Sequence, residues 1–302
     1  MVWNKRYYYL SLAMIDPEFS DSEIRDYRER GYIVVPELIP PETIVGIDRA
    51  IQDLTARALS QDDYSDVLEL EPGSPDDQPA VRRIYQPFVQ HQSFERLARD
   101  PGILDRVEQL IGPDIHLQHS KLNMKPAEVG SVVEWHQDLT YFPHTNDDLV
   151  AVLVYLDEAT EINGCLRVLS GQHAAFLEHN TDDGAFAGMI TEDLSGGRYG
   201  TEIALPAPAG SVIFMHCLTP HSSRPNQSRK PRRTIIFEYR AADSFPLYLG
   251  EMSARNEEFA IQIRGNPATH ARLGDIAPPI PRFAGKVSSL YDLQEKTQSS
   301  RA

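Results

Sequence analysis

A chain of 302 residues, 41% hydrophobic and 24% charged, is long enough for one large domain or two ordinary ones, and its composition argues against a disordered or fibrous protein. The formal net charge of −15 opposes binding to a polyanion, so no nucleic-acid partner is expected. Two cysteines cannot build a disulfide framework and no run of about 18 apolar residues could span a bilayer, which together favour a cytoplasmic protein without a membrane partner.

The domain organisation follows from where the regular patterns begin and end. Residues 1–19 are expected to form a flexible extension, because their apolar stretch is too short, and too rich in Tyr, for a signal peptide. Met14 is an alternative start. A single domain is predicted over residues 20–282, and the Pro-rich, then polar tail at 283–302 is expected to fray.

The first third of the chain is predicted to be mainly helical. Capping residues in front and a glycine behind predict a helix over residues 20–31, which the β-rich run Tyr32–Val35 follows. A Pro-Pro pair opens a second helix at residues 40–59. The acidic, polar segment 61–80 is expected to be a mobile surface loop, and residues 93–111 give two short helices broken at a Pro-Gly pair.

The pattern changes to short β-rich runs in the middle of the chain. These runs are predicted at 115–124, 131–137, 149–156, 165–169, 201–205, 211–216 and 233–240. Because turn residues, and no long helices, separate them, they favour a sandwich, a jelly roll or a barrel. The Gly-rich, acidic loop at 178–200 is long enough to be a lid or a binding loop.

His136 and Asp138 form the strongest chemical motif, in the segment Trp135-His-Gln-Asp. Because residues i and i+2 of a strand point to the same face, an imidazole and a carboxylate would lie side by side there. This is two thirds of the two-His, one-carboxylate triad that binds iron(II) with open positions. Alone, the motif is weak, since a polar-site His beside an unrelated surface Asp gives the same pattern.

The third ligand must come from a distant strand, and His221 is the candidate. It follows the β-rich run 211–217 where the chain turns, and Arg232 comes eleven residues later at the start of the next strand. A guanidinium grips a carboxylate through two parallel hydrogen bonds, as the far end of a dicarboxylate co-substrate requires. His216 competes for the ligand role but lies inside its strand, and strand alternation turns Arg233 away.

These motifs resemble the phytanoyl-CoA dioxygenase family. The similarity covers most of residues 20–242 and is carried by segments in the family's order, at 31–36, 125–126, 136–143, 148–150, 163–166, 168–173, 221–226 and 232–233. The resemblance implies a mainly β fold with α additions, in which N-terminal helices pack outside a double-stranded β-helix, the cupin-like jelly roll.

The resemblance also implies the cofactor and its ligands. His136, Asp138 and His221 match the family's Fe(II) ligands. Arg232 matches the residue that binds the distal carboxylate of 2-oxoglutarate, and Lys121 falls where the family often contacts this co-substrate. The implied reaction is an O2-dependent hydroxylation of an unactivated C–H bond in a small organic molecule, with succinate and carbon dioxide as co-products.

Two departures from the family pattern bear on local geometry. Residues 170–173 read Ser-Gly-Gln-His where Pro-Gly-Ser-His is common, and Ser222 replaces the usual Gly after the second histidine, which restricts the backbone there. Neither change removes a ligand. The retained Asp138 is informative, because related halogenating enzymes have Gly or Ala at this position, so hydroxylation is favoured.

Tyr141, Phe142 and Arg83 are further candidates for the substrate pocket. The two aromatic residues follow the metal motif, where they would either line the pocket or pack within a loop. Arg83 contributes only if the fold brings its segment to the site. The basic cluster at 224–233 is interpreted mainly as solvated turn charges around an internal Arg232.

Two other functions fit part of the pattern. A zinc-dependent hydrolase also uses two His and one Asp, but it gives no reason for Arg232. A non-catalytic jelly-roll binding protein would leave all four residues without a role. The sequence does not choose among an acyl-CoA, an amino acid and a natural-product intermediate, although the acidic composition favours a free small molecule.

Overall fold

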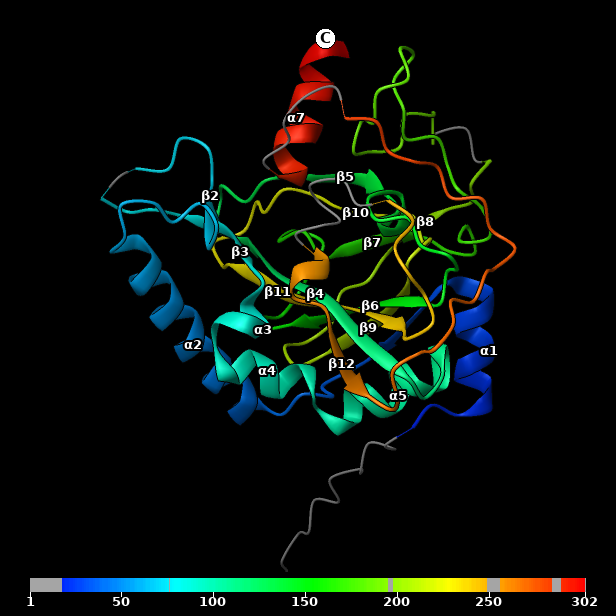
Figure 1. The fold of residues 1–302 in the computed structure, drawn as a ribbon. Coiled ribbons are helices and arrows are strands. Elements are labelled where there is room, and N and C mark those ends of the chain that lie inside the picture. Colours follow the sequence, from blue (N-terminus) through cyan, green and yellow to red (C-terminus); the bar gives the residue numbers. More distant parts are fainter. Residues whose placement is uncertain (1–17, 76, 195–197, 249–255, 284–288, 302) are drawn as a thin grey trace, which may run out of the picture.

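Two antiparallel sheets form the centre of the computed structural model, which describes residues 18–75, 77–194, 198–248, 256–283 and 289–301 (Figure 1). The larger sheet runs in the order β1 (Tyr32–Val35), β9 (Val212–His216), β6 (Leu149–Tyr155), β11 (Arg232–Ala241), β4 (Ile115–Lys125), β3 (Val81–Tyr85) and β2 (Leu68–Leu70), with β12 (Ile261–Arg264) paired to β4. The smaller sheet runs β5 (Val133–His136), β10 (His221–Ser223), β7 (Leu166–Leu169) and β8 (Glu202–Ala204). This is the jelly-roll arrangement that the family resemblance implied.

Strand β6 shows how the larger sheet separates two cores. Val150, Val152 and Val154 pack toward the helices, and the alternate residues Leu153 and Tyr155 belong to the cluster between the two sheets. All seven residues of β6 are buried because both faces of the sheet are covered. The polar residues that face the space between the sheets therefore need partners inside the fold.

The helices of the N-terminal half cover the outer face of the larger sheet (Figure 1). They are α1 (Asp21–Arg30), α2 (Pro41–Leu59), α3 (Pro87–Gln90), α4 (Gln92–Ala98) and α5 (Pro101–Ile111). Helix α1 begins with a capping box between Ser20 and Glu23, and ends at Gly31 in the left-handed conformation. The helices expected at 20–31, 40–59 and 93–111 are thus confirmed.

The prediction of a surface loop at 61–80 was wrong for part of its length. Strand β2 lies within it, and both Leu68 and Glu71 are buried. Glu71 accepts a hydrogen bond from the backbone N–H of Ser131 at 3.1 Å, which ties the segment to the start of the smaller sheet. Strands β2 and β3 have three and five residues, too few for a clear alternating pattern.

The prediction of a frayed tail was also wrong. Residues Leu290–Arg301 form helix α7, which buries Leu290, Tyr291 and Leu293. The amide of Gln294 fixes the helix by donating to the carbonyl of Gly188 at 2.7 Å and accepting from the N–H of Glu134 at 3.1 Å. A polar helix is therefore held by its few apolar residues and by side-chain hydrogen bonds to neighbouring loops.

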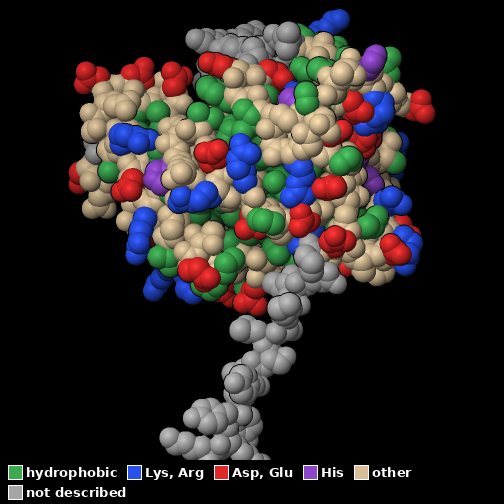
Figure 2. All heavy atoms as spheres, turned by 60° about the horizontal axis from the view of Figure 1, so that its bottom comes forward, with side chains coloured by type: hydrophobic (Ala, Val, Ile, Leu, Met, Phe, Trp, Pro, Cys, Tyr) green, Lys and Arg blue, Asp and Glu red, His purple; other side chains and the backbone are tan. Residues whose placement is uncertain are grey.

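At the other end of the chain, residues 1–17 of the expected extension lie outside the described residues. Phe19 is buried against Phe214, with ring centroids 5.1 Å apart, so the extension does not include it. Acidic and basic side chains are interspersed on the face in Figure 2 rather than gathered by sign. No helix in the described part of the chain is long and apolar enough to cross a membrane.

Candidate metal centre and adjoining cavities

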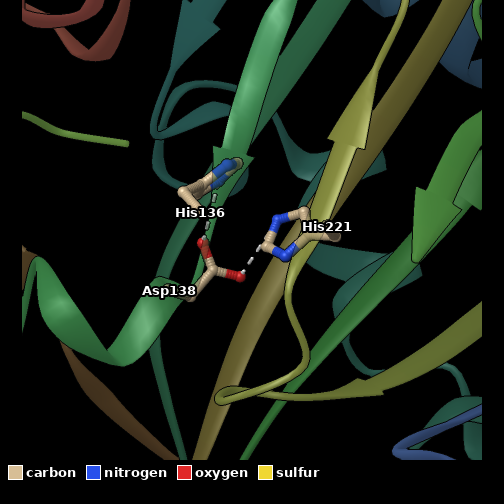
Figure 3. A group of neighbouring side chains, drawn as sticks. All are labelled: His136, Asp138 and His221. Atoms are coloured by element: carbon tan, nitrogen blue, oxygen red, sulfur yellow. Dashed lines mark ion pairs between the residues drawn. The ribbon is translucent and has the colours of Figure 1, made fainter. Parts of the chain in front are cut away.

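His136, Asp138 and His221 meet at one edge of the smaller sheet (Figure 3). His136 is the last residue of β5, and His221, the first of β10, is its partner in the register of the sheet. One ligand atom of each side chain lies within 4.8 Å of the others. The carboxylate oxygens of Asp138 lie 3.8 Å from Nε2 of His136 and 3.7 Å from Nε2 of His221.

The strand alternation used to join His136 and Asp138 extends beyond the strand itself. Strand β5 ends at His136, and Asp138 already begins the 3-10 turn Asp138–Thr140. Gln137 between them keeps an extended backbone, with φ −122° and ψ 128°, so the two side chains still point the same way. The amide of Gln137 bonds to the carbonyls of Ala175 at 2.9 Å and Leu218 at 2.7 Å, which fixes this link.

Backbone carbonyls orient both imidazoles. Nδ1 of His136 lies 2.8 Å from the carbonyl oxygen of Glu134, and Nδ1 of His221 lies 2.9 Å from that of Thr219. Because a carbonyl only accepts hydrogen bonds, each Nδ1 carries the hydrogen. The lone pairs of both Nε2 atoms then face the centre of the triad, as metal ligation requires.

The charge states of the triad suit a divalent cation. Burial lowers the pKa of His136 well below its ordinary value, and burial also lowers the pKa of His221, so both imidazoles are neutral near pH 7. Burial opposes ionisation of Asp138, but the nearby charge of Lys121 is the largest opposing influence, and the pKa of the carboxyl lies below its ordinary value. Two neutral imidazoles and one carboxylate are a ligand set for iron(II).

Lys121 lies beside the triad in an ion pair that the sequence did not reveal. Its Nζ is 3.6 Å from Oδ1 of Asp138 and 3.1 Å from Oε1 of Glu238. Burial and the charge of Asp138 raise the pKa of Glu238 to about 7. Glu238 lies on β11 beside the strand that carries Lys121, and no motif in the sequence marks it.

Arg232 lies inside the jelly roll without an acidic partner. It is 5% exposed, and it donates to Oγ1 of Thr234 at 2.8 Å and to the carbonyl of Gly164 at 2.6 Å, while its Nε has no partner. Within the described ranges it forms no ion pair. Burial lowers the pKa of Arg232. Its neighbour Arg233 points outward and pairs with Asp157, as strand alternation predicted.

Two cavities adjoin the triad. The smaller, of about 40 Å³, is lined by the triad and by Arg232, Lys121, Tyr155 and Tyr291. The larger, of about 390 Å³, is lined by His136, Asp138, Lys121 and the three residues predicted for a substrate pocket, Arg83, Tyr141 and Phe142. Arg83 lines both cavities.

Three side chains of the larger cavity were missed by the sequence analysis or assigned elsewhere. His119, which the sequence analysis did not single out, lies two residues before Lys121 on β4, and its ring packs edge-on against Phe142 with centroids 5.3 Å apart. The i, i+2 spacing from Lys121 was the signal that could have found it. Leu290 and Ser289 enter from the C-terminal segment that was expected to fray.

His216, the competing ligand, is held away from the triad. Its Nε2 lies 3.7 Å from a carboxylate oxygen of Asp147, and its ring packs against His173 with centroids 5.1 Å apart. The structure therefore brings His221, and not His216, to His136 and Asp138. The structure thus places a distant histidine beside the H-x-D motif, and the ligand roles of these three residues stay a prediction.

The family model described as phytanoyl-CoA dioxygenase (PhyH) matches residues 27–234. A probable alpha-ketoglutarate-dependent hypophosphite dioxygenase from Stutzerimonas stutzeri is 28% identical over 85% of this chain and 90% of its own length. L-proline trans-4-hydroxylase from Streptomyces griseoviridis is 26% identical over 76% of this chain and 88% of its own. The crystal structure of EctD from S. alaskensis with bound Fe superposes with a TM-score of 0.68 and 23% identity, covering 83% of this chain and 88% of that one, which supports the fold.

Proposed function

The chain belongs to the phytanoyl-CoA dioxygenase family and is a non-haem Fe(II)- and 2-oxoglutarate-dependent dioxygenase, and we propose that it hydroxylates a C–H bond of a small molecule held in the larger cavity. One observation carries the proposal: one ligand atom from each of His136, Asp138 and His221 lies within 4.8 Å of the others, and two cavities lined by His136 and Asp138 adjoin this cluster. The hydrolase and the non-catalytic binding protein are not supported by these relatives.

We assign Fe(II) to His136, Asp138 and His221, because their protonation states and their common centre fit the metal. Three protein ligands leave positions for a chelating co-substrate and for O2. When bound, Fe(II) with 2-oxoglutarate and O2 supplies an oxidative decarboxylation that yields succinate and carbon dioxide and oxidises the substrate. The protein supplies the ligand geometry, the orientation of both small molecules and the exclusion of water.

Arg232 is proposed to bind the distal carboxylate of 2-oxoglutarate. Its guanidinium is buried with only neutral acceptors, a hydroxyl and a carbonyl, and its Nε lacks a partner. A buried cation in this state is stabilised by an incoming carboxylate. Thr234, two residues along the same inner face of β11, already contacts the guanidinium and limits the positions that the carboxylate can take.

Lys121 is proposed to contact the metal-proximal side of the co-substrate, and the observed ion pairs explain how it is held there. Its two carboxylate partners, Asp138 and Glu238, keep the ammonium beside the triad. Tyr141 donates a hydrogen bond to the carbonyl of Gly188, which fixes its ring at the wall of the larger cavity. The aromatic and aliphatic walls reduce the access of water to the metal position.

A small molecule, rather than an acyl-CoA, is the substrate class we propose. The larger cavity has a volume of about 390 Å³, near the lower end of the range of roughly 300–1,000 Å³ for small-ligand sites. The named substrates of the relatives, hypophosphite, L-proline and ectoine, are all small. The cytoplasmic location expected from the two free, buried cysteines stays a prediction.

The test is an anaerobic titration of metal-free protein with iron(II) and 2-oxoglutarate, followed by the weak visible band of the chelate. We expect the band in the wild-type protein, and a large loss of 2-oxoglutarate affinity in Arg232→Ala. Arg224→Ala is the matched control, because Arg224, at the other end of the same connection, is 56% exposed and in the described ranges pairs with Glu202 alone. Iron binding without a band in the wild-type protein would contradict the co-substrate assignment.

A further inference from the structure

Arg83 is a buried cation that the proposed function leaves without a role. It lies in β3, is 6% exposed, and donates through Nε to Oδ1 of Asn123 at 3.0 Å. Its Nη2 is buried without a hydrogen-bond partner, and in the part of the chain that the structure describes it forms no ion pair. A buried guanidinium with an unused N–H group and no counter-ion is costly unless a ligand supplies the partner.

The neighbouring Arg82 shows that the fold can neutralise an arginine in this place. Arg82 is equally buried, but it pairs with Glu69 and, at 3.3 Å, with Glu295. It lines neither cavity, whereas Arg83 lines both. Among these two adjacent arginines, only the one that faces the site lacks a carboxylate.

Two contacts hold the Arg83 guanidinium in place at the cavity wall. The ring of Tyr291 from α7 lies 5.0 Å from the guanidinium carbon, and Asn123 holds Nε from the adjacent strand. Both contacts use neutral groups, so they orient the side chain without cancelling its charge. The guanidinium is therefore pre-organised with its charge available to a ligand.

A count of charges around the metal position gives the same result. One carboxylate of 2-oxoglutarate and Asp138 balance Fe(II), and the other carboxylate balances Arg232. Lys121 is balanced by Glu238 at 3.1 Å. Lys125 also lines the smaller cavity, but it donates to the carbonyl of Ser131 and burial lowers its pKa well below the ordinary value, so it is left out of the count. Of the cations counted here, Arg83 remains for the substrate to neutralise.

Resting on the proposed function, we propose that Arg83 binds an oxyanion group of the substrate, so that the substrate is a small molecule with a carboxylate or a phosphorus oxyanion. Because Arg83 and the metal ligands line the same cavity, the oxidised C–H bond lies only a few bonds from this group. Asp66 and Glu258 line the same cavity and are exposed, so they stand at its open side. Their charges oppose the entry of a polyanion and favour a substrate with one anionic group.

The experiment uses the wild-type protein with iron(II) and 2-oxoglutarate under anaerobic conditions, where binding near the metal perturbs the chelate band without turnover. The probes are small aliphatic and aromatic carboxylates, each with the carboxamide and the phosphonate of the same carbon skeleton. We expect some oxyanions to perturb the band at millimolar concentration, and their carboxamides to bind at least about tenfold more weakly. Comparing the affinities of the carboxylate and the phosphonate of each skeleton then shows which of the two oxyanions the site prefers.

Variants at position 83 test whether Arg83 is the residue that favours an oxyanion over the matching carboxamide. Arg83→Gln is expected to weaken the oxyanion roughly 10- to 100-fold and to leave the half-saturation by 2-oxoglutarate within about twofold. Arg83→Lys, which keeps the charge, is expected to retain part of the affinity. Thermal unfolding of both variants checks that the fold is intact.

Three results would overturn the inference. In the first, carboxamides bind as well as carboxylates; in the second, no oxyanion binds at all. In the third, Arg83→Gln weakens 2-oxoglutarate instead of the probe, which would assign Arg83 to the co-substrate. Failure of the chelate band in the wild-type protein is a different result, because it refutes the proposed function itself.

Discussion

Lys121 and Glu238 form a buried ion pair beside the triad, and we expect this pair to control how strongly Asp138 binds iron. Nζ of Lys121 lies 3.1 Å from Glu238 and 3.6 Å from Asp138. At a pH above the raised pKa of Glu238, both partners carry a unit charge, and at an effective dielectric constant of about 20 two unit charges at 3.1 Å attract by about 5 kcal/mol. Burying each ion costs several kcal/mol, so the net effect of the pair on folding is small. Its main effect then falls on the metal site.

Glu238→Gln is the perturbation that isolates this effect. It keeps the shape and an acceptor for Lys121 but removes one negative charge. Among the described residues, Asp138 is then the only carboxylate paired with Lys121, so the ammonium competes with iron for it. We expect iron(II) affinity to fall about tenfold, or about 1.4 kcal/mol, the size typical of groups that orient metal ligands.

The double variant Lys121→Met/Glu238→Gln separates competition from general damage. It removes both members of the pair and the competing cation, so we expect iron affinity to return to within about threefold of the wild-type value. The assay is an anaerobic iron(II) titration of metal-free protein against a chelator, with chemical denaturation as the check on folding. Wild-type affinity in Glu238→Gln would refute the reasoning, as would a double variant no tighter than the single one.

Three further predictions concern protonation, the co-substrate pocket and the C-terminal helix. Because burial lowers the pKa of His136 and His221, the affinity for iron should stay nearly constant between about pH 7.5 and pH 6.5. The stability of the metal-free protein should fall below about pH 6.5, because the imidazoles of the unfolded chain gain protons there. A tenfold change in iron affinity between about pH 7.5 and pH 6.5 would contradict this prediction. Gly164→Ala should destabilise the fold by about 1–3 kcal/mol in chemical denaturation, because the φ of Gly164 is +79° and the added Cβ would lie 2.3 Å from a carbonyl oxygen. The variant should also weaken the binding of 2-oxoglutarate, because the Gly164 carbonyl accepts a hydrogen bond from Arg232. Unchanged denaturation and 2-oxoglutarate titrations would contradict this prediction. Tyr291→Ala removes a buried side chain and should release α7, at a loss of stability of at most about 3–5 kcal/mol. We expect faster amide hydrogen exchange confined to α7, and unchanged exchange in α7 would contradict the prediction.

The ligand residues were predictable because each rests on a short-range rule. Alternation along an extended chain joined His136 to Asp138 even though the strand ends between them. The same rule put Arg232 inside and Arg233 outside. His221 required a long-range contact, and there the ordered motifs of the family, rather than any local pattern, made the choice over His216.

The residues that complete the site were not predictable, because their role depends on three-dimensional neighbours. Glu238 acquires its role only through the register that places β11 beside β4, and the register is shifted between Glu238 and Tyr239. Tyr291 belongs to a helix that is polar by sequence and is held by hydrogen bonds to distant loops. Arg83 lay in a three- to five-residue strand pair that gave no periodic signal.

Strands β4 and β11 carry most of the charged side chains of the site, so the register between these two strands controls where the charges lie. The inner faces of β4 and β11 carry Lys121 and Lys125 on one side and Arg232 and Glu238 on the other. A slip of one residue would turn each of these charges toward the apolar core under the helices, where none could be solvated. The ten residue pairs between β4 and β11 therefore fix the fold and the charge pattern at once. Arg83, on the adjacent strand β3, adds to this pattern a buried cation that forms no ion pair among the described residues.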